Sequence, residues 1–190
     1  RFERTLTHPA RNQETELGNL YADVLQEDSS FDIMLFGSGT LRKTELGPVV
    51  EYQHLMETTP YDDCLWMLSV TGTQLKKMIL YVLRDEAWNG HTEFYQVSRG
   101  VCIRYSKSTR QLLEFTYNGQ DIQDDTLYSI ALQDYHFKNF DAFFNVPLEE
   151  VKKNRIPRIV ATSCNNIFEE YFSTHTRLDA KIEGRIQITD

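Results

Sequence analysis

The apolar residues of this chain recur with two different periods, and this alternation constrains the fold more than any other feature. Apolar residues spaced three and four positions apart begin at Leu17 and again at Leu75, the second time just after a helix start signal at Thr71-Gly72. A third stretch of this kind surrounds Phe168. Each stretch predicts an amphipathic helix that buries one face.

Between these helices the chain has the short apolar runs and alternating patterns that are typical of strands. Strands are predicted at 31–36, 65–70, 101–105, 113–117, 127–132, 156–161 and 182–188. Asn118-Gly119 predicts a hairpin turn, and 49–52 a short strand or the approach to a helix. Because helices and strands are interspersed without strict βαβ alternation, we expect an α+β fold with a mixed or antiparallel sheet.

Composition excludes several classes of protein. A chain of 190 residues that is 41% hydrophobic can build a core, so wholesale disorder is excluded and one domain is the natural expectation. No apolar run is long enough for a membrane span. The net charge of −8 argues against a nucleic-acid polymer as partner, because that interaction needs clustered Lys and Arg. Three widely spaced cysteines predict buried thiols rather than a disulfide framework or a metal site.

Two segments next to predicted strands have the residue types of a ligand site. In Gly37-Ser38-Gly39-Thr40-Leu41-Arg42 the glycines allow backbone N–H groups to approach an anion, and Arg42 adds a charge. Thr59-Pro60-Tyr61-Asp62-Asp63 can present the Tyr61 ring on a loop, where it would stack on a flat ligand. Each segment has a plain structural alternative, a tight turn.

A third segment, 134–143, contains Asp134, His136 and Asp141. Their spacing is not that of a recognised metal-ligand set, so we predict no metal site. Ser38, His136 and Asp141 could be drawn as a catalytic triad, but Ser38 does not lie in a G-x-S-x-G elbow, so we predict no catalytic residue. The residues alone therefore predict an α+β domain with an anion- and ring-binding cleft.

The same segments resemble, in the same order, motifs of the C-terminal domain of the 5′-nucleotidase family, which includes ecto-5′-nucleotidases and bacterial UDP-sugar hydrolases. Residues 14–23 are similar to the family's ETxLGNLxAD helix, 36–42 to its NGGGIR loop, and 59–75 to LPFGN…LTGxxL. Residues 95–98 resemble the family motif FLQVSG, and residues 128–143 resemble YRVATNDYLASGGDGF. The segment 182–186 is also similar to the end of the family's domain.

The resemblance implies a four-layer α/β/β/α domain with mixed sheets over residues 13–190, with residues 1–12 leading in from an N-terminal domain outside this chain. In the family that N-terminal metallophosphoesterase domain carries two divalent metal ions and performs the hydrolysis, while the C-terminal domain binds the nucleotide. We therefore expect a nucleotide-recognition domain that needs no cofactor of its own, is inactive alone, and belongs to a secreted, surface-attached or periplasmic hydrolase.

The resemblance also implies roles for individual residues. Arg11 and Arg42 match family arginines that contact the ligand's phosphate, and Ser38 and Gly39 lie in the same loop. Tyr61 and Tyr135 match the two stacking positions, and Asp141 matches a carboxylate that contacts the ribose hydroxyls. Guanidinium, aromatic and carboxylate groups are suited to these three tasks.

Some positions depart from the family pattern. Gly37 or Ser38 stands where the family often has Asn, Asp62-Asp63 replace two small or amide residues, and Phe140 replaces a glycine. Acidic residues repel a phosphate, and a phenylalanine can fill a cleft. The alternative to nucleotide recognition is therefore a degenerate domain of the same fold, with an altered ligand or a purely structural or interaction role. A stand-alone hydrolase that uses His136 is not expected.

Overall fold

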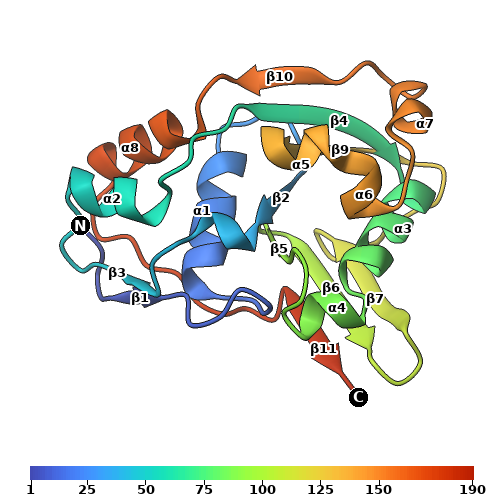
Figure 1. The fold of residues 1–190 in the computed structure, drawn as a ribbon, viewed down its shortest axis with the longest axis horizontal. Coiled ribbons are helices and arrows are strands. Elements are labelled where there is room, and N and C mark those ends of the chain that lie inside the picture. The colour runs from blue at the N-terminus through green and yellow to red at the C-terminus, as the bar shows by residue number, and fades with distance from the viewer.

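Two sheets organise the computed structural model, which describes residues 1–190 (Figure 1). The larger sheet has the strand order β10-β4-β9-β2-β5, and the smaller has β11-β6-β7-β8. Their strands are β2 (Ile33–Gly37), β4 (Leu65–Thr71), β5 (Tyr95–Val97), β6 (Val101–Ser106), β7 (Gln111–Tyr117), β8 (Gln120–Asp121), β9 (Leu127–Gln133), β10 (Arg158–Ala161) and β11 (Ile186–Thr189). Both sheets mix parallel and antiparallel pairs, which confirms the α+β class with mixed sheets.

Eight helices pack around the two sheets (Figure 1). They are α1 (Glu16–Gln26), α2 (Tyr52–Thr58), α3 (Gly72–Val82), α4 (Asp85–Trp88), α5 (Asp134–Lys138), α6 (Phe140–Phe144), α7 (Leu148–Lys152) and α8 (Cys164–Thr174). In Figure 1, α8 and α2 lie on the left and α3, α6 and α7 on the right. No helix is both long and apolar enough to cross a bilayer.

Strand β2 separates two hydrophobic cores because successive side chains on a strand point to opposite faces. Ile33 and Leu35 pack into the core that contains α3 and the smaller sheet, whereas Met34 and Phe36 pack into the core that contains α1 and α8. Every residue of β2 is buried, as expected for a nearly continuous apolar run. Because β2 ends at Gly37, the segment that follows lies at one edge of the sheet.

The ends of the two main helices are defined by threonine caps. The Thr15 hydroxyl accepts a hydrogen bond from the Gly18 N–H at the start of α1. Thr71 and Gln74 form a reciprocal capping box at the start of α3. Both helices begin where the sequence pattern predicted, and the hairpin turn at Asn118-Gly119 also joins two strands, β7 and β8.

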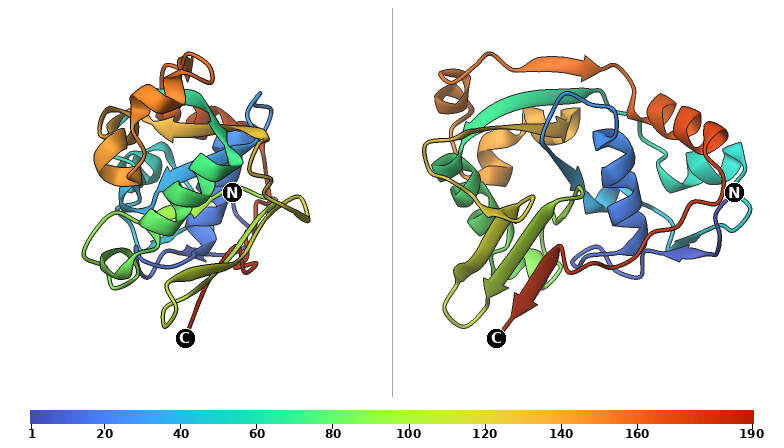
Figure 2. Two further views of the ribbon diagram at one scale, coloured as in Figure 1. Left: turned by 90° about the vertical axis from the view of Figure 1, so that its right-hand side faces the viewer. Right: turned by 180° about the vertical axis from the view of Figure 1, so that it is seen from behind.

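Residues 1–12 pack against the rest of the chain although they show no periodicity. Phe2 and Leu6 are buried in the core beside α1. The two-residue strand β1 (Leu6–Thr7) pairs with β3 (Glu45–Leu46), a pairing too short to leave a sequence pattern. At the other end of the chain, β11 runs beside β6 along the outer edge of the smaller sheet (Figure 2). That residues 1–12 lead in from a further domain stays a prediction.

Candidate functional site

A cleft of about 350 Å³ opens at one edge of the larger sheet. It is lined by Arg11, Gly39, Thr40, Arg42, Tyr61, Asp63, Glu93, Tyr135 and His136. Strands β2 and β9 are parallel neighbours, so the segments that follow their carboxyl ends meet here. The edge of an α/β sheet at which such strands end is a common place for a ligand site.

Gln133, the last residue of β9, ties these two segments together. Its side-chain oxygen accepts a hydrogen bond from the Gly37 N–H at 2.8 Å, and its side-chain NH₂ donates to the Thr40 hydroxyl at 2.9 Å. The single-turn 3₁₀ helix at 38–40 is thereby held against the start of α5. This contact fixes the positions of Gly39 and Arg42 relative to Tyr135.

Gln96, in β5, connects the same loop to the segment that carries Arg11. Its NH₂ group donates to the Ser38 hydroxyl at 2.9 Å and to the Gln13 carbonyl at 2.8 Å. Ser38 is fully buried beneath the cleft and does not line it. The structure therefore brings Arg11, Gly39 and Arg42 together, and Ser38 supports the loop from below.

Two tyrosines line the cleft with unusually exposed rings. Tyr61 is 71% exposed and Tyr135 53% exposed, although most aromatic rings of this chain are buried. The Arg42 guanidinium lies 5.4 Å from the centre of the Tyr61 ring. The Tyr135 ring packs edge-on against His136. Exposed aromatic faces in a cleft are suited to stacking on a flat heterocycle.

His136 forms the floor of the cleft and is neutral. Its Nδ1 shares a hydrogen bond of 2.7 Å with the Tyr95 hydroxyl, and burial lowers its pKa to about 4. A Cβ on Gly37 would lie 2.2 Å from His136 Nε2, so only glycine fits at position 37 beside this ring. His136 thus occupies space next to the position where the family often has an asparagine.

The two consecutive acidic residues have different surroundings. The Asp62 carboxylate accepts hydrogen bonds from the Ser163 hydroxyl and the Asn165 N–H, so it caps α8. The Asp63 side chain lines the cleft, where burial and the nearby Asp134 carboxylate raise its pKa to about 6. Only one of the two acidic residues therefore lines the cleft.

Glu93 is a cleft residue that sequence reasoning missed. Burial raises the pKa of its carboxyl group, and the positive charges of Arg11 and Arg42 oppose this effect. It precedes the Tyr95–Ser98 motif by two residues, and this position was the only signal that could have found it. His136, Asp63 and Thr40 were likewise not predicted to bind a ligand.

Other candidates lie outside the cleft. The Asp141 carboxylate, in the first turn of α6, accepts a hydrogen bond from the Leu148 N–H at 2.9 Å and joins this helix to the start of α7. Phe140 is buried against Phe144, so it does not fill the cleft. Ser38, His136 and Asp141 bond to Gln96, Tyr95 and Leu148 respectively, so they do not form a triad.

The arrangement of His, Cys, Asp and Glu side chains offers no metal site. No group of three or more of them has the geometry to hold an ion. Asp134 accepts a hydrogen bond from the Trp66 indole and forms an ion pair with Lys138. Its carboxylate oxygens therefore already have partners within the chain.

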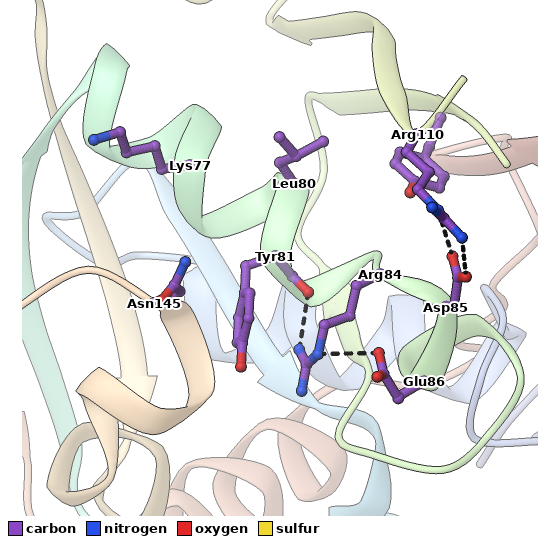
Figure 3. Close-up of a pocket in the computed structure, with 9 residues that line it drawn as sticks. Lys77, Leu80, Tyr81, Arg84, Asp85, Glu86, Arg110 and Asn145 are labelled. Carbon is purple, nitrogen blue, oxygen red and sulfur yellow. Dashed lines mark hydrogen bonds and ion pairs between the residues drawn. The ribbon is translucent and has the colours of Figure 1, made fainter. Parts of the chain in front are cut away.

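A second hollow, of about 560 Å³, lies between α3 and the loop that joins β6 and β7 (Figure 3). Arg110 pairs with Asp85, and Arg84 pairs with Glu86 while its guanidinium stacks on the Tyr81 ring at 3.8 Å. Since these charges neutralise one another, we assign no ligand to this hollow.

Acidification is expected to destabilise the fold. Burial lowers the pKa of both His8 and His136 from 6.5 to about 4. Between pH 4 and pH 6.5 the two imidazoles bind protons in the unfolded chain but not in the folded chain. Their contribution to the free energy of unfolding is therefore fully present above pH 6.5 and is lost as the pH falls towards 4. Asp63 and Glu93, whose carboxyl pKa values are raised by burial, act in the opposite direction. We expect a net loss of about 3 kcal/mol between pH 7 and pH 4.5, measured by urea unfolding. An unchanged free energy of unfolding would contradict neutral buried imidazoles.

Comparison with known proteins gives a consistent picture. The family model described as "5′-nucleotidase, C-terminal domain" matches residues 3–147. The 5′-nucleotidase precursor from Thermus thermophilus superimposes with a TM-score of 0.82 at 18% identity, over 99% of this chain and 38% of that protein. The NAD nucleotidase of Haemophilus influenzae gives 0.73 at 12% identity, over 97% of this chain and 36% of the other. No curated protein sequence matches. The chain thus spans less than two fifths of these structural neighbours.

Proposed function

The chain belongs to the 5′-nucleotidase family as its C-terminal domain, and on this premise we propose that it recognises the nucleotide substrate of a 5′-nucleotidase-like phosphoesterase. The observation that carries the proposal is the presence of two exposed tyrosine rings and two arginines in one cleft. The rings suit a base, and the guanidinium groups of Arg11 and Arg42 suit a phosphate.

Hydrolysis belongs, in this proposal, to an N-terminal metallophosphoesterase domain with two divalent metal ions, located outside this chain. The parent protein would act outside the cytoplasm, as a secreted, surface-attached or periplasmic hydrolase. Residues 1–190 alone would bind substrate without hydrolysing it, because Ser38, His136 and Asp141 each bond to other residues and the hydrolytic machinery is proposed to lie in the N-terminal domain. Incubation with a nucleotide and a phosphate-release assay checks this, and turnover by the isolated chain would contradict it.

Two features bear on the degenerate-domain alternative. Phe140 is buried and Asp62 caps α8, so neither obstructs the cleft. Asp63 and Glu93 do line it, and the carboxyl group of Glu93 lies within the electrostatic range of Arg11 and Arg42. These acidic residues favour an altered ligand preference over the loss of binding.

Calorimetric titration with adenosine monophosphate tests the proposal. Stacking contributes about 1–3 kcal/mol per ring, so Tyr61→Ala and Tyr135→Ala should each weaken binding by about tenfold or more. Tyr52→Ala is the matched control, because Tyr52 is 60% exposed and does not line the cleft. Binding that is indifferent to both cleft tyrosines would overturn the assignment.

Removing the charge of Glu93 is expected to tighten phosphate binding. Its carboxylate lies in the electrostatic range of Arg11 and Arg42 and therefore opposes a bound phosphate. Glu93→Gln should strengthen binding of adenosine monophosphate by about tenfold and leave adenosine unchanged. Glu86→Gln, at a surface ion pair with Arg84, serves as the control. Weaker binding by the Glu93 variant would show that this carboxylate contacts the ligand favourably.

A further inference from the structure

Tyr95 and His136 form a buried polar pair under the cleft. The Tyr95 hydroxyl and His136 Nδ1 lie 2.7 Å apart, and the two side chains are 4% and 3% exposed. Both residues stand where the motifs that this chain resembles have leucine, since Gln96–Ser98 match QVS of FLQVSG and Tyr135 matches the second tyrosine of YRVATNDYLASGGDGF. The pair therefore departs from the family pattern at both positions, and each of its polar atoms needs a partner.

The Tyr95 hydroxyl decides which nitrogen of the imidazole carries the proton. Burial lowers the pKa of His136 to about 4, so the ring is neutral and only one of its nitrogens is protonated. His136 Nδ1 is the only hydrogen-bond partner of the hydroxyl. If Nδ1–H donated to the tyrosine oxygen, the hydroxyl proton would be buried without an acceptor. The hydroxyl therefore donates to Nδ1, and the imidazole proton is on Nε2.

His136 Nε2–H is a donor that the chain itself leaves free. Nδ1 makes the one hydrogen bond of this side chain, so nothing in the chain accepts from Nε2. The four buried side-chain atoms that are fully enclosed and lack a partner include His8 Nε2 but not His136 Nε2. Since His136 lines the cleft, its Nε2 can be reached from there. A Cβ on Gly37 would lie 2.2 Å from this nitrogen, so position 37 has no side chain that could cover it.

A base stacked on Tyr135 would offer acceptors to this donor. The ring centres of Tyr135 and His136 are 5.4 Å apart, and the ring planes are inclined by 75°. A heterocycle that lies flat on the exposed Tyr135 face turns its edge towards the side chains beside that ring. The ring nitrogens and carbonyl oxygens of a base lie in this edge and accept hydrogen bonds.

We propose that His136 Nε2–H donates a hydrogen bond to an acceptor on the edge of the bound base, so that His136 is a specificity residue of the cleft. Tyr95 is then the positioning residue that holds the proton on Nε2. The inference rests on the proposed function, because it requires a base against Tyr135. A site built to donate discriminates against a ligand without the acceptor, because the N–H is then left unpaired.

Long-range proton–nitrogen NMR spectra of the 190-residue chain test the proton position without any substitution. We expect the Nε2–H form of His136, and a shift of its Nε2 resonance when adenosine is added. His8 is the internal control, because it is also 3% exposed and its Nδ1 bonds to the Thr15 hydroxyl at 2.8 Å, but its Nε2 is fully enclosed. A proton on His136 Nδ1, or saturation with adenosine that leaves Nε2 unshifted, would overturn the inference.

Deaza analogues of adenosine identify the acceptor. In each of three analogues, one of the ring nitrogens N1, N3 and N7 is replaced by C–H. We expect one analogue to bind about tenfold more weakly than adenosine, and this ratio to approach one in His136→Leu. His136→Gln retains an N–H donor and should keep part of the ratio. His175→Leu is the matched control, because this exposed ring stacks on Tyr171 outside the cleft.

The outcomes separate the two proposals. A ratio lost in His136→Leu and kept in His175→Leu supports the inference, whereas a ratio kept in both assigns the contact to another residue and overturns it. Equal binding of adenosine and all three analogues, with the dependence on Tyr61 and Tyr135 intact, overturns the inference and leaves the proposed function standing. Absence of binding to every nucleoside and to adenosine monophosphate overturns both. If His136→Leu does not fold, the spectra of the unaltered chain decide.

Discussion

Replacing Arg185 with methionine is expected to destabilise the domain by about 3–5 kcal/mol. The Arg185 side chain is 4% exposed, and its two terminal nitrogens donate to the Asp23 carboxylate at 2.7 and 2.8 Å. It also donates to the Val97 carbonyl, so it joins α1, β5 and the start of β11. Loss of the guanidinium leaves the buried carboxylate without its main partner, and this penalty exceeds any gain in apolar packing.

Urea unfolding measures this loss. Arg110→Met is the matched control, because Arg110 pairs with Asp85 at the surface, where solvent screens the two charges and the pair contributes little to stability. If the Arg185 variant were no less stable than the Arg110 variant, the buried pair would not stabilise the fold. This pair lies away from the cleft, so binding of adenosine monophosphate by the folded variant should be unchanged.

Replacing Arg42 with methionine is expected to weaken binding of adenosine monophosphate by about 30-fold, since charged hydrogen bonds contribute roughly 1.5–3 kcal/mol. The effect on adenosine should be far smaller, because adenosine lacks the phosphate. A small residual effect is expected because the Arg42 guanidinium also lies over the Tyr61 ring. Calorimetry with both ligands separates the two contributions, and Arg110→Met again serves as the control. An equal loss of affinity for both ligands would show that Arg42 does not contact the phosphate.

Much of the fold could be predicted from the sequence because long elements leave long patterns. The helices that begin near Leu17 and Leu75 and the strand at 31–36 have clear periodicity, and the structure confirms them. The two-residue strands β1 and β3 and the single-turn α7 are too short to show a period. They are stabilised by tertiary contacts that no local pattern records.

The candidate site was predictable only in part. Residue types and the family resemblance selected Arg11, Arg42, Tyr61 and Tyr135, all of which line one cleft. The sequence could not separate Asp62 from Asp63, because their different orientations depend on α8, about 100 residues later.

Two further cleft residues were not accessible from the sequence for a similar reason. Glu93 and His136 enter the cleft through the pairing of β5 and β9 with β2. Asp141 matched a motif, but its carboxylate is bonded to the start of α7. Side-chain direction at these positions is a property of the assembled fold.

The central claim is that the base of a nucleotide lies between Tyr61 and Tyr135. Intermolecular nuclear Overhauser effects between adenosine monophosphate and the 190-residue chain test it most directly. We expect the base protons to contact the ring protons of both tyrosines. Base protons that contact neither ring, and instead contact Tyr81 in the hollow of Figure 3, would contradict the account.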